Sequence, residues 1–298
     1  MVAGTSGFTT LSPLQSVASM PVGFPTIQLV RHAVYLPPFG SFGDVHALVE
    51  LAVLAEESGW DGFFLWDHIQ YEEPVSLCDT WIALAAVASN TSSIRLGPLI
   101  TPLPRRRPWK VAREAVTLDH LSGGRLVLGV GLGIDFWGEF SAFDGEATTD
   151  VVRAEMVEDG IEIITRLWSG EPTSYRGRRL AVSDAQFLPR PVQKPGIPIW
   201  SAMLWPASKP GPVRRAARCD GVMPFTGAPM TPDQAGAAHA AVAAERGDTD
   251  FDLCVWGDLD HAADYEAAGV TWLVDAPGPD TPLPTVRSAI ADGPPRPH

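Results

Sequence analysis

The sequence has few cysteines, few basic residues and no long apolar run. Its three cysteines show no CxxC spacing, and their odd number favours reduced thiols and a cytoplasmic location over a disulfide framework. No apolar run reaches the roughly 18 residues of a membrane-spanning helix, so no membrane partner is expected. The 22 lysines and arginines face 35 acidic residues, and a formal charge of −13 argues against a nucleic-acid partner.

Several catalytic signatures are also missing. The chain has no HExxH motif and no Ser-His-Asp spacing, and its seven histidines are scattered, so no metal site is expected. No two carboxylates are clearly poised for glycoside hydrolysis. These absences exclude the commonest hydrolase chemistries and favour a reaction in which a bound cofactor supplies the reactivity.

The stretch from residue 94 to 133 organises the chain. An apolar run (94–100) precedes a helical pattern that opens at Pro108 and closes at Ser122-Gly123-Gly124, and a second apolar run (125–132) follows. Buried parallel strands read as continuous apolar runs because helices cover both faces of their sheet. Proline at a helix start and glycine at its end fit the backbone there. The stretch therefore predicts a β-α-β unit.

The same alternation continues over the whole chain. Apolar strand patterns occur at residues 27–36, 61–66, 94–100, 125–132, 197–203, 221–225, 251–256 and 270–274. Eight strand-then-helix pairs predict an α/β fold, a closed (β/α)8 TIM barrel over residues 26–298. Residues 169–195 are expected to leave the barrel as an excursion with a small hairpin near 175–180, and residues 1–25 to be a flexible extension. A doubly wound open sheet is the rival, but its dinucleotide turn needs G-x-G-x-x-G at the first strand.

In a barrel, catalytic groups lie just past the carboxyl ends of the strands. This rim is predicted to be apolar and aromatic with few ionisable groups, which suits a flat conjugated cofactor. His68 is the imidazole placed directly on it, either as an acid–base group or as a histidine that packs a loop. The basic run Arg105-Arg106-Arg107 with Lys110 opens a helix, where it would bind an anion or form a solvated turn. The predicted substrate pocket consists of Phe39, Trp66, Phe136, Trp137 and Trp205.

Several segments resemble the bacterial luciferase-like monooxygenase superfamily, and they occur in family order. They are AEESGWDGFFLWDH (55–68), AREAVTLDHLSGGRLVLGVGLG (112–133), PIWSAM (198–203), RRAARCDGVMPF (214–225), AGVTWLV (268–274) and AIADGPPR (289–296). The resemblance implies a (β/α)8 oxidoreductase that uses reduced FMN with O2, or the deazaflavin coenzyme F-420 for hydride transfer. It also implies a small organic substrate, a homodimer and, for the FMN alternative, a separate flavin reductase. A barrel that binds flavin without turnover remains the alternative function.

The resemblance also carries site residues. Asp67-His68 is similar to the pair that deazaflavin-dependent members place against the cofactor ring, with His68 as the catalytic residue. Lys110 falls where light-emitting members bind the FMN phosphate, and a non-proline cis peptide bond is implied near Leu99-Ile100. Deazaflavin-dependent members often carry a glutamate directly after the Gly-x-Gly of the fourth strand, whereas this chain has Ile134 and then Asp135. The predicted cofactor-binding residues are Asp67, Leu99, Ile100, Thr101, Lys110, Gly131 and Gly133.

Overall fold

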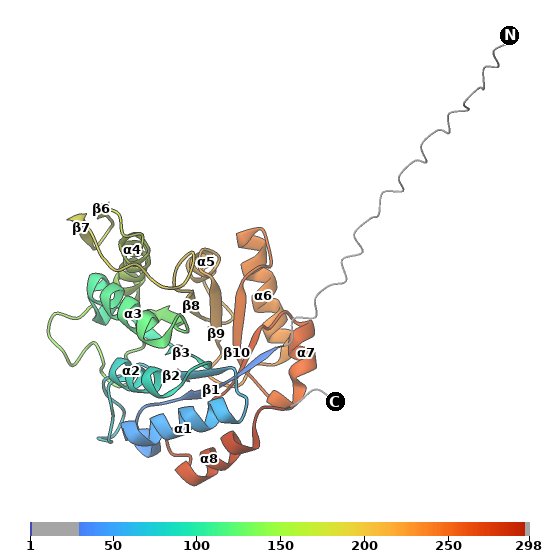
Figure 1. Ribbon diagram of the computed structural model, residues 1–298. Coiled ribbons are helices and arrows are strands. Elements are labelled where there is room, and N and C mark those ends of the chain that lie inside the picture. The colour runs from blue at the N-terminus through green and yellow to red at the C-terminus, as the bar shows by residue number, and fades with distance from the viewer. Residues whose placement is uncertain (2–29, 296–298) are drawn as a thin grey trace.

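The predicted strands form one parallel sheet. A computed structural model of the protein describes Met1 and residues 30–295. Its main sheet has nine strands in the order β3-β2-β1-β11-β10-β9-β8-β5-β4, and every neighbouring pair is parallel. The helices surround this sheet (Figure 1). The strands are β1 (Arg31–Leu36), β2 (Gly62–Leu65), β3 (Arg95–Pro98), β4 (Thr101–Pro102), β5 (Leu128–Gly131), β8 (Ile199–Leu204), β9 (Gly221–Phe225), β10 (Asp252–Trp256) and β11 (Trp272–Asp275).

The sheet closes into a barrel between β3 and β5. β3 pairs with β2 and β4 pairs with β5, so these two short segments occupy one barrel position. A parallel bridge joins Leu96 to Leu126, and Val127 N donates to Leu96 O at 2.9 Å. The ring therefore has eight strand positions. The predicted (β/α)8 barrel is confirmed, and the doubly wound open sheet is excluded.

The barrel interior is filled with large apolar side chains. The rings of Phe64, Trp200 and Trp272 lie 5.6–5.7 Å from one another, and none of the three is measurably exposed. Such packing leaves the barrel no channel along its axis. A site for a cofactor is therefore confined to the mouth at the carboxyl ends of the strands.

The helices begin where the sequence predicts. Asp44 and Asp79 stand directly before α1 and α2, where an aspartate is a favoured cap, and Asp44 accepts from His46 N and Asp79 from Ile82 N, each at 2.9 Å. Gly123 ends α3 with φ +68°. The helices are α1 (Val45–Glu57), α2 (Thr80–Asn90), α3 (Pro108–Ser122), α4 (Asp150–Trp168), α5 (Pro210–Ala216), α6 (Pro232–Arg246), α7 (Ala262–Ala267) and α8 (Leu283–Asp292), with single 3-10 turns η1 (Gly40–Phe42), η2 (Leu103–Arg105) and η3 (Leu259–His261).

Residues 169–195 lie outside the barrel sheet. They contain an antiparallel hairpin, β6 (Thr173–Arg176) with β7 (Ala181–Ala185), which stands beyond α4 (Figure 1) and confirms the predicted hairpin. The extension expected at residues 1–25 falls, apart from Met1, outside the described residues, as do 27–29 of the first predicted strand. No helix within residues 30–295 is long and apolar enough to cross a membrane.

Candidate active site

His68 lies at the barrel mouth, three residues past the end of β2, and a buried carboxylate holds it. Its Nδ1 lies 2.8 Å from Oε2 of Glu139, a residue of the loop between β5 and α4. An ionised carboxylate can only accept, so Nδ1 carries the proton in this pair. Among the described residues nothing hydrogen-bonds to Nε2 of His68. That nitrogen is therefore free to accept or donate a proton toward a ligand.

Glu139 and Asp67 are linked by two arginines. Arg105 donates through Nη1 to Oε1 of Glu139 and through Nη2 to the backbone oxygen of Asp67 at 2.8 Å. Arg106 Nη2 lies 3.0 Å from both carboxylate oxygens of Asp67. The side chains of Asp67, Arg105 and Glu139 are at most 5% exposed. Two buried carboxylates and two arginines thus form one hydrogen-bonded network beneath His68.

The partners of these carboxylates offset the cost of burying them. Burial alone would raise the pKa of Glu139, but the hydrogen bond and charge of His68, the charge of Arg105 and the N–H of Ile69 lower that pKa below its usual value. Asp67 Oδ2 also accepts from Thr101 Oγ1 at 2.8 Å and from Trp81 Nε1 at 3.2 Å. Glu139 is therefore held as a fixed negative charge, and Asp67 is surrounded by hydrogen-bond donors.

This network corrects two predictions. The rim was expected to carry few ionisable groups, yet the fold brings together Asp67, His68, Arg105, Arg106 and Glu139 from three strand-to-helix loops. The prediction failed because these residues are separated by up to 72 positions and only barrel closure makes them neighbours. The alternative of a solvated basic turn is wrong for Arg105 and Arg106, whose side chains are 5% and 20% exposed.

Aromatic rings surround the imidazole of His68. The His68 ring lies 5.0 Å from that of Trp137 and 5.9 Å from those of Phe39 and Trp66. The ring of Tyr71, a residue that no sequence pattern singled out, lies 4.5 Å from that of Trp137 and 4.7 Å from that of Phe39. Three of the five predicted pocket residues are therefore gathered around His68, where they form an apolar wall.

The mouth also contains an unpaired donor. The indole Nε1 of Trp66 is buried and has no hydrogen-bond partner among the described residues, and Tyr35 packs beside it with a ring separation of 5.7 Å. A buried donor without an acceptor costs about 1–3 kcal/mol. A flat ring that carries carbonyl oxygens, such as a flavin or deazaflavin, could supply the acceptor and stack on the aromatic wall. The residues present therefore fit such a cofactor.

The predicted cofactor segment along the third barrel strand has the implied backbone. The Leu99-Ile100 peptide bond is cis, as the family resemblance implies. Close packing against this segment explains why glycine stands at positions 131 and 133. A Cβ on Gly131 would lie 2.8 Å from Ile100 Cγ2, and one on Gly133 would lie 2.8 Å from Pro102 Cβ. These glycines let β5 approach β4 closely, and their contact with a cofactor stays a prediction.

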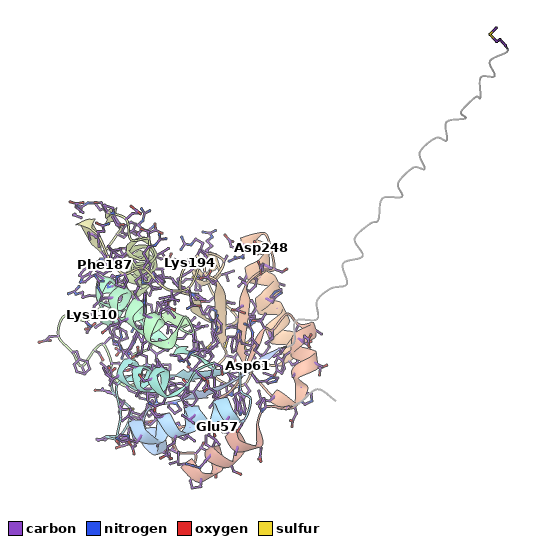
Figure 2. All side chains as sticks on the ribbon, in the orientation of Figure 1. Glu57, Asp61, Lys110, Phe187, Lys194 and Asp248 are labelled. Atoms are coloured by element: carbon purple, nitrogen blue, oxygen red, sulfur yellow. The ribbon has the colours of Figure 1, made fainter. Side chains whose placement is uncertain are left out.

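In the described part of the chain, no hydrogen bond, ion pair or ring contact links the other predicted site residues to His68. Lys110 stands at the edge of the molecule (Figure 2), where its side chain is 67% exposed and pairs with Glu114. Phe136 is 83% exposed, and Trp205 makes no recorded ring contact among the described residues. Asp135, the acid nearest the position of the family glutamate, instead accepts from Phe140 N at 2.8 Å and stabilises its own loop.

Glu139 is the residue of the candidate site that the sequence pattern did not indicate. Its signal was present, because the long acidic and aromatic loop after the fourth barrel strand was too long to be a simple connector. That loop contains four acids, namely Asp135, Glu139, Asp144 and Glu146. Of these, Glu139 is 1% exposed and contacts His68. Which of these four acids contacts His68 could not be predicted without the fold.

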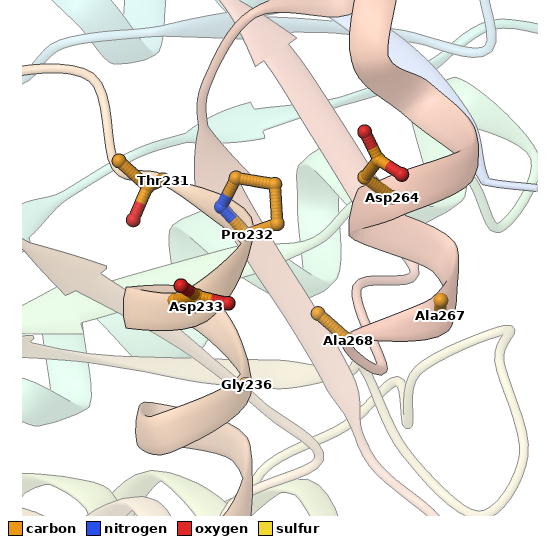
Figure 3. Close-up of a pocket in the computed structure, with 7 residues that line it drawn as sticks. All are labelled: Thr231, Pro232, Asp233, Gly236, Asp264, Ala267 and Ala268. Atoms are coloured by element: carbon orange, nitrogen blue, oxygen red, sulfur yellow. The ribbon is translucent and has the colours of Figure 1, made fainter.

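Two hollows on the outer surface lie elsewhere. One, of about 630 Å³, separates α6 from α7, with Asp233 and Asp264 on its two sides (Figure 3). The other, of about 280 Å³, is an apolar groove between α3, α4 and β7. Neither contains His68 or Glu139. Within residues 30–295, no three histidine, cysteine, aspartate or glutamate side chains gather as metal ligands. The network at the mouth is therefore the candidate site.

Comparisons with known proteins identify the family of the chain. The luciferase-like monooxygenase family matches residues 26–268. The chain is 34% identical over 178 residues to the F-420-dependent glucose-6-phosphate dehydrogenase of Microbacterium testaceum, a match that covers 54% of this chain and 48% of the relative. The chain thus spans about half the length of that curated relative.

Solved structures share the fold. The F-420-dependent tetrahydromethanopterin reductase of Methanopyrus kandleri superposes with a TM-score of 0.70 at 20% identity, over 88% of this chain and 96% of that one. The oxygenating constituent of 3,6-diketocamphane monooxygenase from Pseudomonas putida, solved with FMN, gives 0.60 at 16% identity, over 75% and 64%. Both F-420 and FMN thus occur among the proteins similar to this chain. The family match extends over most of the sequence, and the chain belongs to the luciferase-like monooxygenase family.

Proposed function

We propose that the protein is an oxidoreductase that transfers a hydride between coenzyme F-420 and a small organic substrate at the barrel mouth. The observation that carries this proposal is His68, held through Nδ1 by the buried Glu139 and free at Nε2. The fixed tautomer lets Nε2 accept a proton when the substrate is oxidised and return it when the substrate is reduced. The bound cofactor supplies the two-electron chemistry that side chains lack.

The residues that would hold the cofactor come from neighbouring strands. The segment Leu99-Ile100-Thr101 and the glycines Gly131 and Gly133 lie together along β4 and β5, next to the mouth. Asp67 stiffens this edge through its bond to Thr101. We propose that the cofactor ring lies against these strands with one face toward His68.

F-420 is preferred to FMN for two reasons. The curated relative is named as F-420-dependent, and the Asp67-His68 pair matches the resemblance to deazaflavin-dependent members. FMN is the second candidate, because Arg107 and Lys110 stand exposed at the start of α3, where the helix N-terminus would favour a phosphate. That alternative brings O2 as co-substrate and a separate flavin reductase as a partner.

Titration of the purified protein with F-420, FMN and reduced FMN tests the proposal. F-420 is expected to bind with a saturable change in its visible absorbance, and a screen of alcohols should then reduce it without consuming O2. Oxygen consumption with reduced FMN alone would favour the monooxygenase alternative. Binding without turnover of any substrate would leave a flavin-binding barrel, and no binding at all would overturn the proposal.

Replacing His68 by alanine tests its role. Acid–base assistance contributes about a hundredfold to ten-thousandfold in rate, so His68→Ala is expected to lower kcat at least about a hundredfold with nearly unchanged cofactor affinity. His46→Ala removes an exposed imidazole from α1 and serves as the matched control. Full activity of the His68 variant would show that the histidine only packs the loop and takes no part in the reaction.

A further inference from the structure

The imidazole of His68 is enclosed by aromatic rings, although it lies at the barrel mouth. Its side chain is 15% exposed, with the ring of Trp137 at 5.0 Å and those of Phe39 and Trp66 at 5.9 Å. These separations are those of aromatic rings in contact. A flat ligand therefore needs one of the three rings to turn away before it can lie against the imidazole.

Two of the three rings are fixed to the barrel. Phe39 is not measurably exposed and packs against Trp66 and Tyr71. Trp66 directly follows β2, and its backbone N–H still donates to β1 at 3.0 Å. Trp137 differs, because it lies half-buried on the loop 132–149 and has ring contacts only with His68 and Tyr71 among the described residues. Trp137 is therefore the ring that can turn.

Trp137 lies at the tip of a turn whose base is anchored. Gly138 N donates to Asp135 O at 3.3 Å and closes the turn around the two-residue tip 136–137. On one side of the tip, Asp135 Oδ1 accepts from Phe140 N at 2.8 Å. On the other side, Glu139 is 1% exposed and ion-paired. A movement of the tip alone therefore leaves the contact between Glu139 and His68 in place.

The tip itself is lightly held. Within residues 30–295 its one recorded hydrogen bond to another loop runs from Gln70 Nε2 to the backbone oxygen of Trp137. Phe136, the other tip residue, is 83% exposed, and no ring contact of its side chain is recorded in the described chain. Gly138 has a φ of +73°, and glycine adopts positive and negative φ about equally well, so the turn has a second conformation within reach. Breaking the Gln70 hydrogen bond would free the tip to adopt it.

We propose that Trp137 is a gate over His68 and that Gln70 is its latch. In the closed position, which this structure shows, the indole covers the imidazole. When the Gln70 hydrogen bond breaks, the tip turns, the indole leaves the imidazole, and a ligand can lie against Nε2. Glu139 keeps Nδ1 throughout, so the tautomer of His68 is the same in both positions. The contact of His68 with a ligand rests on the proposed function, whereas the movement of the gate does not.

The rate at which diethyl pyrocarbonate modifies His68 tests the gate without any cofactor. This reagent acylates accessible imidazoles, and peptide mass spectrometry assigns the product to each histidine. A gate that is open for at most about a tenth of the time makes His68 react at least about tenfold more slowly than the exposed His46. Gln70→Leu removes the latch but none of the rings, so it should speed the modification of His68 about threefold to tenfold and leave His46 unchanged.

Two control variants separate the latch from a general loosening of the fold. Gln186→Leu removes the same kind of bond, an amide that donates to Gly170 O at 2.8 Å, from the excursion outside the barrel. Phe136→Ala removes the exposed ring of the tip, which covers nothing in the described chain. Both are expected to modify His68 at the wild-type rate. Circular dichroism checks that every variant is folded, and Gln70→Ala replaces Gln70→Leu if the latter is not.

Three results would overturn the proposal. His68 of the wild type could react as fast as His46, which would mean that no gate covers it. The loss of the Gln70 amide could leave the His68 rate unchanged, which would make Trp137 a fixed part of the wall. Gln186→Leu could speed the reaction as much as Gln70→Leu, which would assign the effect to the whole fold. Failure of every cofactor to bind would count against the proposed function alone, because the modification uses the chain without cofactor.

Discussion

The link between Glu139 and Arg105 makes a quantitative prediction about stability. Arg105 is 5% exposed and Glu139 is 1% exposed, so removing one partner leaves a buried charge without compensation. Such changes cost about 3–5 kcal/mol, whereas replacing both partners by apolar groups is often nearly neutral. Glu139→Leu and Arg105→Met are therefore each expected to lower the free energy of unfolding by that amount. For a chain of this size the loss corresponds to about 6–10 °C in Tm.

The double variant decides whether the loss comes from the pair. If the two charges stabilise each other, the variant that carries both changes should be more stable than the sum of the single effects predicts, by about 1–3 kcal/mol. Equilibrium unfolding in urea, followed by tryptophan fluorescence and circular dichroism, measures all four proteins of the cycle. Single changes that cost less than about 1 kcal/mol, or effects that simply add, would refute the reasoning.

Two further predictions concern the scaffold. The carboxylate of Glu56 accepts hydrogen bonds from the backbone N–H groups of Ser92, Ser93 and Ile94. Burial alone would raise the pKa of Glu56, but these hydrogen bonds lower it to about 2. The lowered pKa of the folded state means that this stabilisation is present above about pH 4.5 and is lost as the pH falls through about 2. Glu56→Gln should therefore cost about 1–2 kcal/mol at pH 7 after allowance for solvent screening, and a difference that persists at pH 2 in urea unfolding would contradict the assignment. Gly133→Ala should cost more than the roughly 1–2 kcal/mol of a left-handed conformation, since its Cβ would also contact Pro102 at 2.8 Å. Gly145→Ala, with φ +87° and no atom within 4 Å of its Cβ, is the control, and equal losses in Tm would exclude a role for that contact.

Features encoded by short stretches of chain were predictable from the sequence. Asp44 and Asp79 cap the helices that they precede, because a cap depends only on residues two or three positions away. The barrel followed from eight repeats of one local pattern. The position of His68 at the mouth followed from the end of β2 alone.

Features that depend on closure of the barrel were not predictable. Glu139 lies 71 residues from His68, and nothing near either residue indicates the pair. Asp135 looked like the closer substitute for the family glutamate, but its carboxylate is taken up by Phe140 and Ser141 of its own turn. The three arginines at 105–107 read alike in sequence, yet two form ion pairs with side chains at most 20% exposed, and one is exposed. Burial of a charged residue is decided by its distant partners, which composition cannot reveal.

The shared network also indicates where this scaffold tolerates redesign. Asp67, Arg105 and Glu139 belong to three successive loops, 66–79, 103–107 and 132–149, which the buried ion pairs join into one unit. An insertion in any of these loops would strain all three. Within residues 30–295, no hydrogen bond or ion pair of the network reaches the loops at 205–209 and 226–231, which follow β8 and β9, the next two strands of the ring after β5. Libraries built to alter substrate range should therefore randomise those two loops and keep the first three intact.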